Sequence, residues 1–130
     1  MAELNLTNID LTDSKALAES IVSILDEKKG RDIRLLHVEE KTILADYFVI
    51  CSGTSNTQIR GLCGEVEFKL GEAGVVPHHM EGVDEGNWIV MDYSSVIVHI
   101  FNREKRQFYN LEKLWNEATE TDISELLTED

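Results

Sequence analysis

The sequence predicts an α/β domain of the α+β kind, in which a mixed β-sheet of about five strands carries helices packed on it. Two long stretches place apolar residues at steps of three and four, the period of a helix, whereas several shorter stretches are continuously apolar or alternate, as strands do. The chain has 130 residues, 42% of them hydrophobic, and its composition changes only in the last dozen positions. We therefore expect one compact domain with its own core.

The first predicted elements are a helix and two strands. Thr12 or Asp13 can cap a helix whose apolar positions share one face, and a glycine follows it. Residues 33–38 and 47–51 are nearly continuous in apolar or β-favouring residues, which predicts central strands covered on both faces over part of their length. The polar residues 39–41 predict a tight link between these neighbouring strands.

A second helix is predicted after a short polar turn. Ser55 or Thr54 can cap it, and apolar residues recur at steps of three and four over 59–73, the clearest helical signal of the chain. Gly74 ends this helix. Residues 75–77 then begin an extended segment, which its proline limits to a short or edge strand.

The rest of the sheet is predicted to be a hairpin. Residues 88–93 and 96–101 are separated only by Ser94 and Ser95, which indicates a tight turn between two strands. Successive side chains of a strand point to opposite faces. Within the first strand, Trp88, Val90 and Asp92 are expected to share one face; within the second strand, Ile97, His99 and Phe101 are expected to share one face.

The two ends of the chain are predicted to lie outside a single domain at residues 13–117. Residues 1–12 form a polar lead, and residues 118–130 form a tail with five acids that we expect to be disordered. Just before this tail, the apolar residues within 111–115 predict a final short helix.

The net charge indicates which kind of partner the protein can bind, and the cysteines indicate the cellular compartment. With 12 Lys and Arg against 25 Asp and Glu, the net charge is −13, which repels nucleic-acid phosphates and anionic membranes and favours a basic partner. Cys51 and Cys63, the only cysteines, are predicted to be buried thiols of a reducing compartment. No export address, organelle address or transmembrane stretch is recognisable, so we expect a cytoplasmic protein without membrane contact.

Three patterns could carry enzyme or metal chemistry, and each has a plainer interpretation. The turn at 52–55 could hold a phosphate, but it lacks the lysine and the glycine spacing of a Walker loop. Glu65 and Glu67 would diverge by about 200 degrees on a helix, too far to hold a metal together. The histidines at 78–79 point to opposite faces of an extended segment, which favours a polar loop or edge strand. We expect no catalytic residue, no metal and no cofactor.

Aromatic, acidic and basic residues gather in and after the hairpin. This mixture is typical of protein-binding hot spots, in which Trp, Tyr and Arg are over-represented. RNA binding through stacked aromatics is the competing interpretation, but the basic residues form only a small patch in an acidic body, which favours protein docking. The residues expected to contact the partner are Trp88, Asp92, Tyr93, His99, Arg106 and Tyr109, with Asp46 and Glu81 as polar supports. Alternation alone leaves open which face of the sheet docks.

Several motifs follow one another in a fixed order between Leu17 and about Trp115. They are Ala45-Asp46-Tyr47-Phe48, Gly53-Thr54-Ser55, Glu81-Gly82, Trp88-Ile89-Val90-Met91-Asp92-Tyr93, Val96-Ile97-Val98-His99-Ile100-Phe101, Arg106-Gln107-Phe108-Tyr109 and Leu111-Glu112-Lys113-Leu114-Trp115. Together they resemble the ribosomal silencing factor family, also called RsfS-type or Iojap-related proteins.

The resemblance implies a nucleotidyltransferase-like topology without catalytic carboxylates, and hence no enzyme activity. It implies binding to the large ribosomal subunit at ribosomal protein L-fourteen, with little direct RNA contact. The bound protein would sterically block joining of the small subunit and repress translation when nutrients are limited, and the free protein would be a homodimer. The residues themselves leave two alternatives: a small nucleotidyltransferase-like enzyme that uses the turn at Ser52-Gly53, and a homodimeric scaffold for another basic partner.

Overall fold

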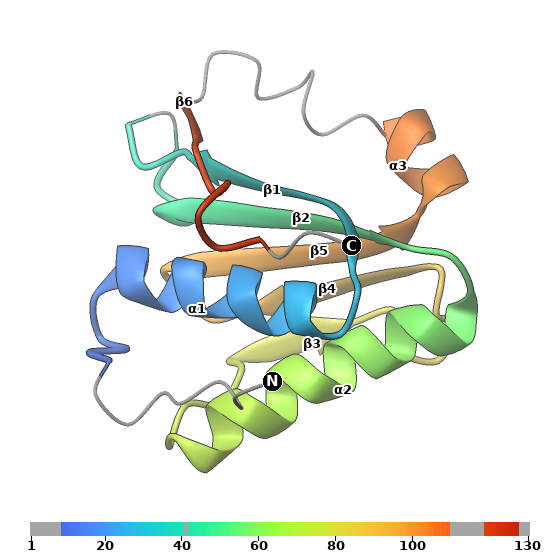
Figure 1. Ribbon diagram of the computed structural model, residues 1–130, viewed down its shortest axis with the longest axis horizontal. Coiled ribbons are helices and arrows are strands. Elements are labelled where there is room, and N and C mark those ends of the chain that lie inside the picture. The colour runs from blue at the N-terminus through green and yellow to red at the C-terminus, as the bar shows by residue number, and fades with distance from the viewer. Residues whose placement is uncertain (1–8, 41, 110–118, 128–130) are drawn as a thin grey trace.

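The computed structural model describes residues 9–40, 42–109 and 119–127, which form a six-stranded mixed sheet and three helices. The strand order in the sheet is β3-β4-β5-β2-β1-β6 (Figure 1). The helices are α1 (Ser14–Glu27), α2 (Asn56–Glu72) and α3 (Arg103–Tyr109). The strands are β1 (Arg31–His37), β2 (Tyr47–Gly53), β3 (His79–Glu81), β4 (Trp88–Asp92), β5 (Val96–Asn102) and β6 (Thr119–Thr121). The predicted α+β fold with a mixed sheet is confirmed, with six strands in place of about five.

The central strands β2 and β5 run parallel, and every other pair of neighbouring strands in the described sheet is antiparallel. Parallel neighbours need a long connection. Here α2, β3 and β4 supply it, so the hairpin β4–β5 returns to the middle of the sheet and pairs with β2. The hairpin therefore lies beside the strands that the first half of the chain builds.

The starts of the long helices agree with the predicted caps. The Asp13 carboxylate and the Ser55 hydroxyl each accept a hydrogen bond of 3.0 Å from a backbone N–H in the first turn of their helix. Gly30 lies where the chain leaves α1 for β1, and a Cβ atom there would lie 2.5 Å from the Cys51 Sγ. Only glycine allows this close approach of the end of α1 to β2.

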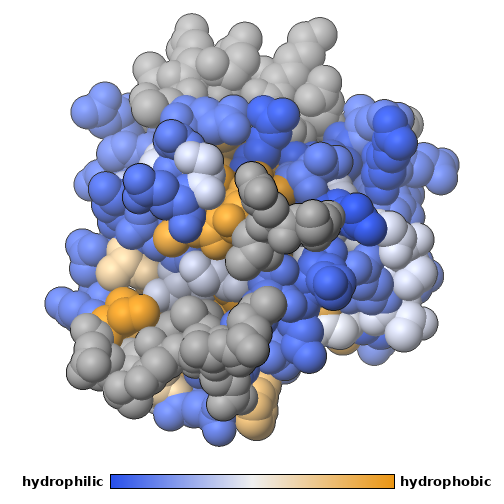
Figure 2. Space-filling model, viewed as in Figure 1, coloured by the Kyte–Doolittle hydropathy of each residue, from blue (hydrophilic) through white to orange (hydrophobic). Residues whose placement is uncertain are grey.

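The helices α1 and α2 pack on one face of the sheet, which we call the helix face (Figure 1). The main core lies between these helices and the sheet. The sheet contributes buried side chains to it, such as Val49, Ile89, Met91, Val98 and Ile100. Seen from this side, the molecule presents mainly hydrophilic residues, with hydrophobic ones showing between them (Figure 2). None of the helices in the described ranges is long and apolar enough to span a membrane.

The opposite face of the sheet, which we call the open face, has a smaller apolar cluster. The buried members of this cluster are Leu36, Val38, Ala45, Phe48, Ile50 and Phe101, with Trp88 and Ile97 packed against them and only partly buried. The short helix α3 contacts β5 and β2 at one end of the sheet.

The predicted edge strand is displaced by a few residues. Residues 75–77 were expected to be extended, whereas β3 begins only at His79, after the proline. Pro77 has no backbone N–H to donate. Pairing with the hairpin starts at the next residue, where the His78 N–H donates to the Asp92 carbonyl at 2.7 Å.

The ends of the chain also differ from the prediction where they are described. Residues 119–121 were expected to belong to a disordered tail, but they form β6 on the edge of β1, and Ile123 is buried in the main core. Ile9 and Leu11, in the predicted polar lead, pack against the same core. The helix predicted within 111–115 lies outside the described residues.

Candidate functional site

The open face carries most of the residues that the sequence pointed to. Register pairs Trp88 with Phe101, Val90 with His99 and Asp92 with Ile97, so these side chains share one face of the hairpin. The sequence predicted the alternation within each strand, and the register adds that the two sets lie on the same face. In the edge strand, His79 is opposite Asp92, and Glu81 is opposite Val90. The half-buried members of this face are Trp88, Val90, Asp92 and Ile97, whereas His79 and Glu81 are exposed.

An aromatic cluster fixes the position of Trp88. Its indole N–H donates to the His99 Nδ1 at 3.2 Å, and its ring centroid lies 5.8 Å from that of Phe101. The ring of His99 meets Phe48 edge-on at a centroid distance of 5.5 Å. Aromatic rings held in this way lose little conformational freedom when a partner covers them.

His99, the hydrogen-bond partner of Trp88, is itself buried. Because its Nδ1 accepts the indole hydrogen bond, the neutral ring carries its proton on Nε2. Burial lowers the pKa of His99 from 6.5 to about 4, so the ring is neutral at physiological pH. His99 therefore positions Trp88 and contributes no charge.

Asp92 shapes the turn of the hairpin. Its carboxylate accepts a hydrogen bond of 2.7 Å from the Ser94 N–H, and Ser94 has a positive φ of 70°. The carbonyl of Ser95 accepts from the backbone N–H groups of Asp46 (2.8 Å) and Tyr47 (3.1 Å). The turn is thus fastened to the start of β2, and Asp46, half-buried, lies beside it.

Arg106 is buried and fastens α3 to the sheet. Its Nη1 donates to the Asp32 carbonyl and to the Ser52 hydroxyl, each at 2.7 Å. The Asn102 side chain caps the start of this helix, because it accepts a hydrogen bond of 2.7 Å from the Lys105 N–H. Arg106 was expected to touch a partner directly, whereas the structure gives its guanidinium a positioning role.

Three further predicted contact residues lie in different settings. Tyr93 is buried in the main core on the helix face, and burial raises the pKa of its hydroxyl, which has no hydrogen-bond partner within the described part of the chain. Glu81 is exposed on β3 and pairs with His79 at 3.1 Å. Tyr109 ends α3, and its side chain lies outside the described residues. Of these three, Tyr93 is on the opposite side of the sheet from Trp88.

The open face also contains residues that sequence reasoning did not select. Val90 and Ile97 are half-buried beside Trp88, and the strand alternation already placed them there. Ile43 and Leu44, in the link between β1 and β2, are exposed. Two adjacent large apolar residues within a polar link were the available signal for that pair.

The turn at the start of α2 is occupied by its own side chains. The Gln58 side chain accepts hydrogen bonds from the Thr54 N–H and hydroxyl, and the Ser55 hydroxyl caps the helix. These bonds support the interpretation of an ordinary strand-to-helix turn. Within residues 9–40, 42–109 and 119–127, no three His, Cys, Asp or Glu side chains gather where they could hold a metal.

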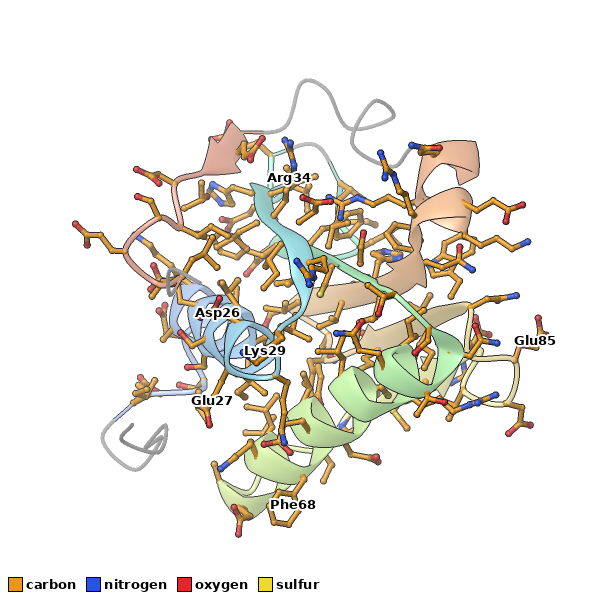
Figure 3. All side chains as sticks on the ribbon, turned by 45° about the vertical axis from the view of Figure 1, so that its right-hand side comes forward. Asp26, Glu27, Lys29, Arg34, Phe68 and Glu85 are labelled. Carbon is orange, nitrogen blue, oxygen red and sulfur yellow. The ribbon has the colours of Figure 1, made fainter. Side chains whose placement is uncertain are left out.

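A separate hollow of about 1220 Å³ lies between the end of α1, β1 and the residues after β6. Side chains of both charge signs line it, among them Asp26, Glu27, Lys29 and Arg34 (Figure 3). Arg34 Nη1 pairs with Glu120 Oε1 at 3.0 Å, which links β1 to β6. Both side chains are about half exposed, so the pair contributes little to stability.

The fold and the site define an α+β domain whose mixed sheet is covered by helices on one face and lined with aromatic and apolar side chains on the other. A family model described as "Ribosomal silencing factor during starvation" matches residues 11–130, and the chain belongs to this RsfS family. Members of the family are ribosome regulators and not enzymes. This finding decides against the predicted alternative of a nucleotidyltransferase-like enzyme at Ser52-Gly53.

Individual relatives agree with the family assignment. The ribosomal silencing factor RsfS of Bacillus subtilis is 36% identical over 111 residues, which cover 85% of this chain and 94% of that protein. A mouse protein named mitochondrial assembly of ribosomal large subunit protein 1 is 33% identical over 100 residues, 75% of this chain and 44% of that protein. A crystal structure from Chromobacterium violaceum has a TM-score of 0.75 at 32% identity and covers 83% of this chain and 88% of its own. The resemblance read from the sequence motifs is confirmed.

Proposed function

We propose that this protein binds the large ribosomal subunit at ribosomal protein L-fourteen through the open face of its sheet. While bound, it sterically blocks joining of the small subunit and thereby represses translation when nutrients are limited. Family membership is the observation that carries the proposal. The name of the mouse relative, which refers to assembly of the large ribosomal subunit, supports that subunit as the partner. No catalytic step is involved.

The open face supports the docking part of this proposal. Trp88 is half-buried, so it has area left to bury against a partner, and its hydrogen bond to His99 holds it in place. Binding hot spots are enriched in such rigid aromatic side chains. In this proposal Trp88 is the central contact, with Asp92, Asp46 and Glu81 at its polar rim and Tyr109 at the end of α3. His99 and Arg106 act by positioning other residues.

The charge of the chain supports a protein partner over RNA. At −13 the molecule is repelled by ribosomal RNA and attracted to a basic ribosomal protein. We therefore expect little direct RNA contact in the complex. We also expect the free protein to be a homodimer in the cytoplasm.

Sedimentation with purified large subunits tests the proposal. The parent protein should travel with the large subunit in a sucrose gradient, and adding it before the small subunit should reduce the seventy-S peak. Isolated L-fourteen should capture the parent protein in a pull-down. Unhindered formation of seventy-S particles at saturating protein would refute the proposed blocking role.

A further inference from the structure

A second exposed feature adjoins the open face: two large aliphatic side chains at the end of the link between β1 and β2. Ile43 is 104% exposed and Leu44 is 65% exposed, and we call this pair the apolar tip. A single exposed leucine is ordinary on a protein surface. Two adjacent aliphatic side chains exposed together, next to the partly buried apolar open face, make a small apolar patch of the kind found at binding surfaces.

The backbone around the apolar tip is held by hydrogen bonds. The base of the link closes where the Val38 N–H donates to the Asp46 carbonyl at 2.8 Å. Nearer the tip, the Thr42 N–H donates to the Val38 carbonyl at 3.1 Å, and the Leu44 N–H donates to the Thr42 hydroxyl at 3.1 Å. These hydrogen bonds restrain the backbone next to the two side chains, which reduces the entropy lost on binding.

The apolar tip is continuous with the open face. Val38 and Ala45, which flank it in the chain, are buried in the same apolar cluster as Phe48, with Trp88 and Ile97 packed against that cluster. The start of β2 is also fastened to the hairpin turn through the Ser95 carbonyl. Ile97 pairs with Phe48 near the start of β2, next to the tip, whereas Trp88 lies opposite Phe101 toward the other end of these strands. A partner that covers Ile97 and extends along the open face to Trp88 would therefore also meet the tip.

Resting on the proposed function, we propose that the apolar tip inserts into an apolar hollow on the same basic large-subunit protein that the open face binds. The charge around the tip argues for this occupant, because three acidic residues, Glu39, Glu40 and Asp46, and one basic residue, Lys41, flank it in the sequence. A hollow with basic residues at its rim would complement this arrangement. The tip then adds affinity, and its acidic flanks set the orientation of the complex.

The same charges disfavour two other occupants. In a two-fold dimer built through this patch, each acidic flank would face its own copy, and like charges brought together across an interface oppose association. An anionic membrane surface would be repelled by the flanks and by the net charge of −13. A basic protein is the occupant that the charges favour.

The test removes the apolar surface of the tip and leaves the fold intact. The double variant Ile43→Ser, Leu44→Ser should bind large subunits at least tenfold more weakly than the parent. Its urea unfolding midpoint should be unchanged or slightly raised, since both side chains are already exposed in the free protein. The conservative double variant Ile43→Met, Leu44→Met should keep most of the affinity, because it retains the apolar area.

A matched control lies on the other side of the molecule. Phe68 is 59% exposed and projects from α2 away from the sheet (Figure 3), so Phe68→Ser removes a large exposed apolar side chain far from the open face. This variant should bind large subunits as the parent does. Equal weakening by Phe68→Ser and by the tip variant would overturn the inference, because the effect would then be one of general surface hydrophobicity.

Failure of the inference can be separated from failure of the proposed function. If Trp88→Ala weakens binding while the tip variant binds as the parent does, the tip has no role and the open face keeps its own. If the tip variant binds large subunits normally but changes from dimer to monomer in light scattering, the occupant is a second copy and the inference is overturned. If the parent protein itself does not bind large subunits, both proposals fail.

Discussion

The two faces of the sheet are built from the same strands, yet they differ in what covers them. On β4 and β5, the residues that point to the helix face are fully buried under α1 and α2, whereas their immediate neighbours in the chain on the open face include the half-buried Trp88, Val90 and Ile97. Because side chains alternate, one step along a strand exchanges a core position for a surface position. Substitutions at two adjacent positions of one strand can therefore affect different properties: one the stability of the fold, the other binding to the partner.

The largest expected effect belongs to the helix face. Ile100 is completely buried between the sheet and the helices, so Ile100→Ala should lower the free energy of unfolding by about 2 to 5 kcal/mol, through lost apolar contact and the cavity left behind. Urea unfolding followed by circular dichroism measures this. Large-subunit binding by the fraction that stays folded should be unchanged. A loss of affinity without a loss of stability would contradict the division between the two faces.

A pH-dependent effect is expected from the buried histidine of the open face. The pKa of His99 is about 4 in the folded protein, below its ordinary value of 6.5, so the unfolded chain takes up the proton first as the pH falls. The stabilisation from neutral His99 is complete above pH 6.5 and is lost as the pH falls toward 4. Between pH 7 and pH 4.5 this amounts to about 2 to 3 kcal/mol.

A variant without a titrating side chain isolates this contribution. His99→Gln keeps an acceptor that can face the indole of Trp88 but has no proton to gain in this range. Urea unfolding of parent and variant at both pH values should show a steeper loss for the parent. Parallel losses in the two proteins would show that protonation of His99 does not contribute to acid unfolding.

Substitution of Trp88 tests whether the open face binds the large subunit. Trp88→Ala should weaken large-subunit binding by about 2 kcal/mol or more, close to thirtyfold, as expected for a central aromatic contact. Trp88→Phe keeps the ring but removes the hydrogen bond to His99, so it should lose less. Equilibrium binding to purified large subunits gives both values. Affinity equal to that of the parent in a folded Trp88→Ala protein would remove Trp88 from the contact surface.

Local patterns predicted most of the fold and the arrangement of the hairpin. The caps at Asp13 and Ser55 and the alternation of the hairpin strands depend on residues close together in sequence, and the structure agrees with them. The strand β6 was not predicted, because its three residues have no strand pattern of their own. The free edge of β1 supplies their pairing.

The roles of single residues were harder to predict, since they depend on partners far away in the chain. Arg106 looks like a surface arginine in sequence, and its burial depends on the Asp32 carbonyl and the Ser52 hydroxyl, which are 74 and 54 residues distant. The sequence also did not predict which face of the hairpin α1 and α2 would cover, because both faces carry apolar residues. Tyr93 was therefore grouped with Trp88, although the two lie on opposite sides of the sheet.

The smallest expected effect concerns the turn that joins the two strands of the hairpin. Asp92→Ala removes the hydrogen bond to the Ser94 N–H and should lower the free energy of unfolding by about 1 kcal/mol. Asp92→Asn keeps an oxygen that can accept this bond, so its stability should stay close to that of the parent. If the carboxylate also faces a basic partner, the Asn variant should bind large subunits more weakly at low salt, and the difference should shrink as salt is added. Equal destabilisation by Asn and Ala would show that the carboxylate charge, rather than the hydrogen bond, holds the turn.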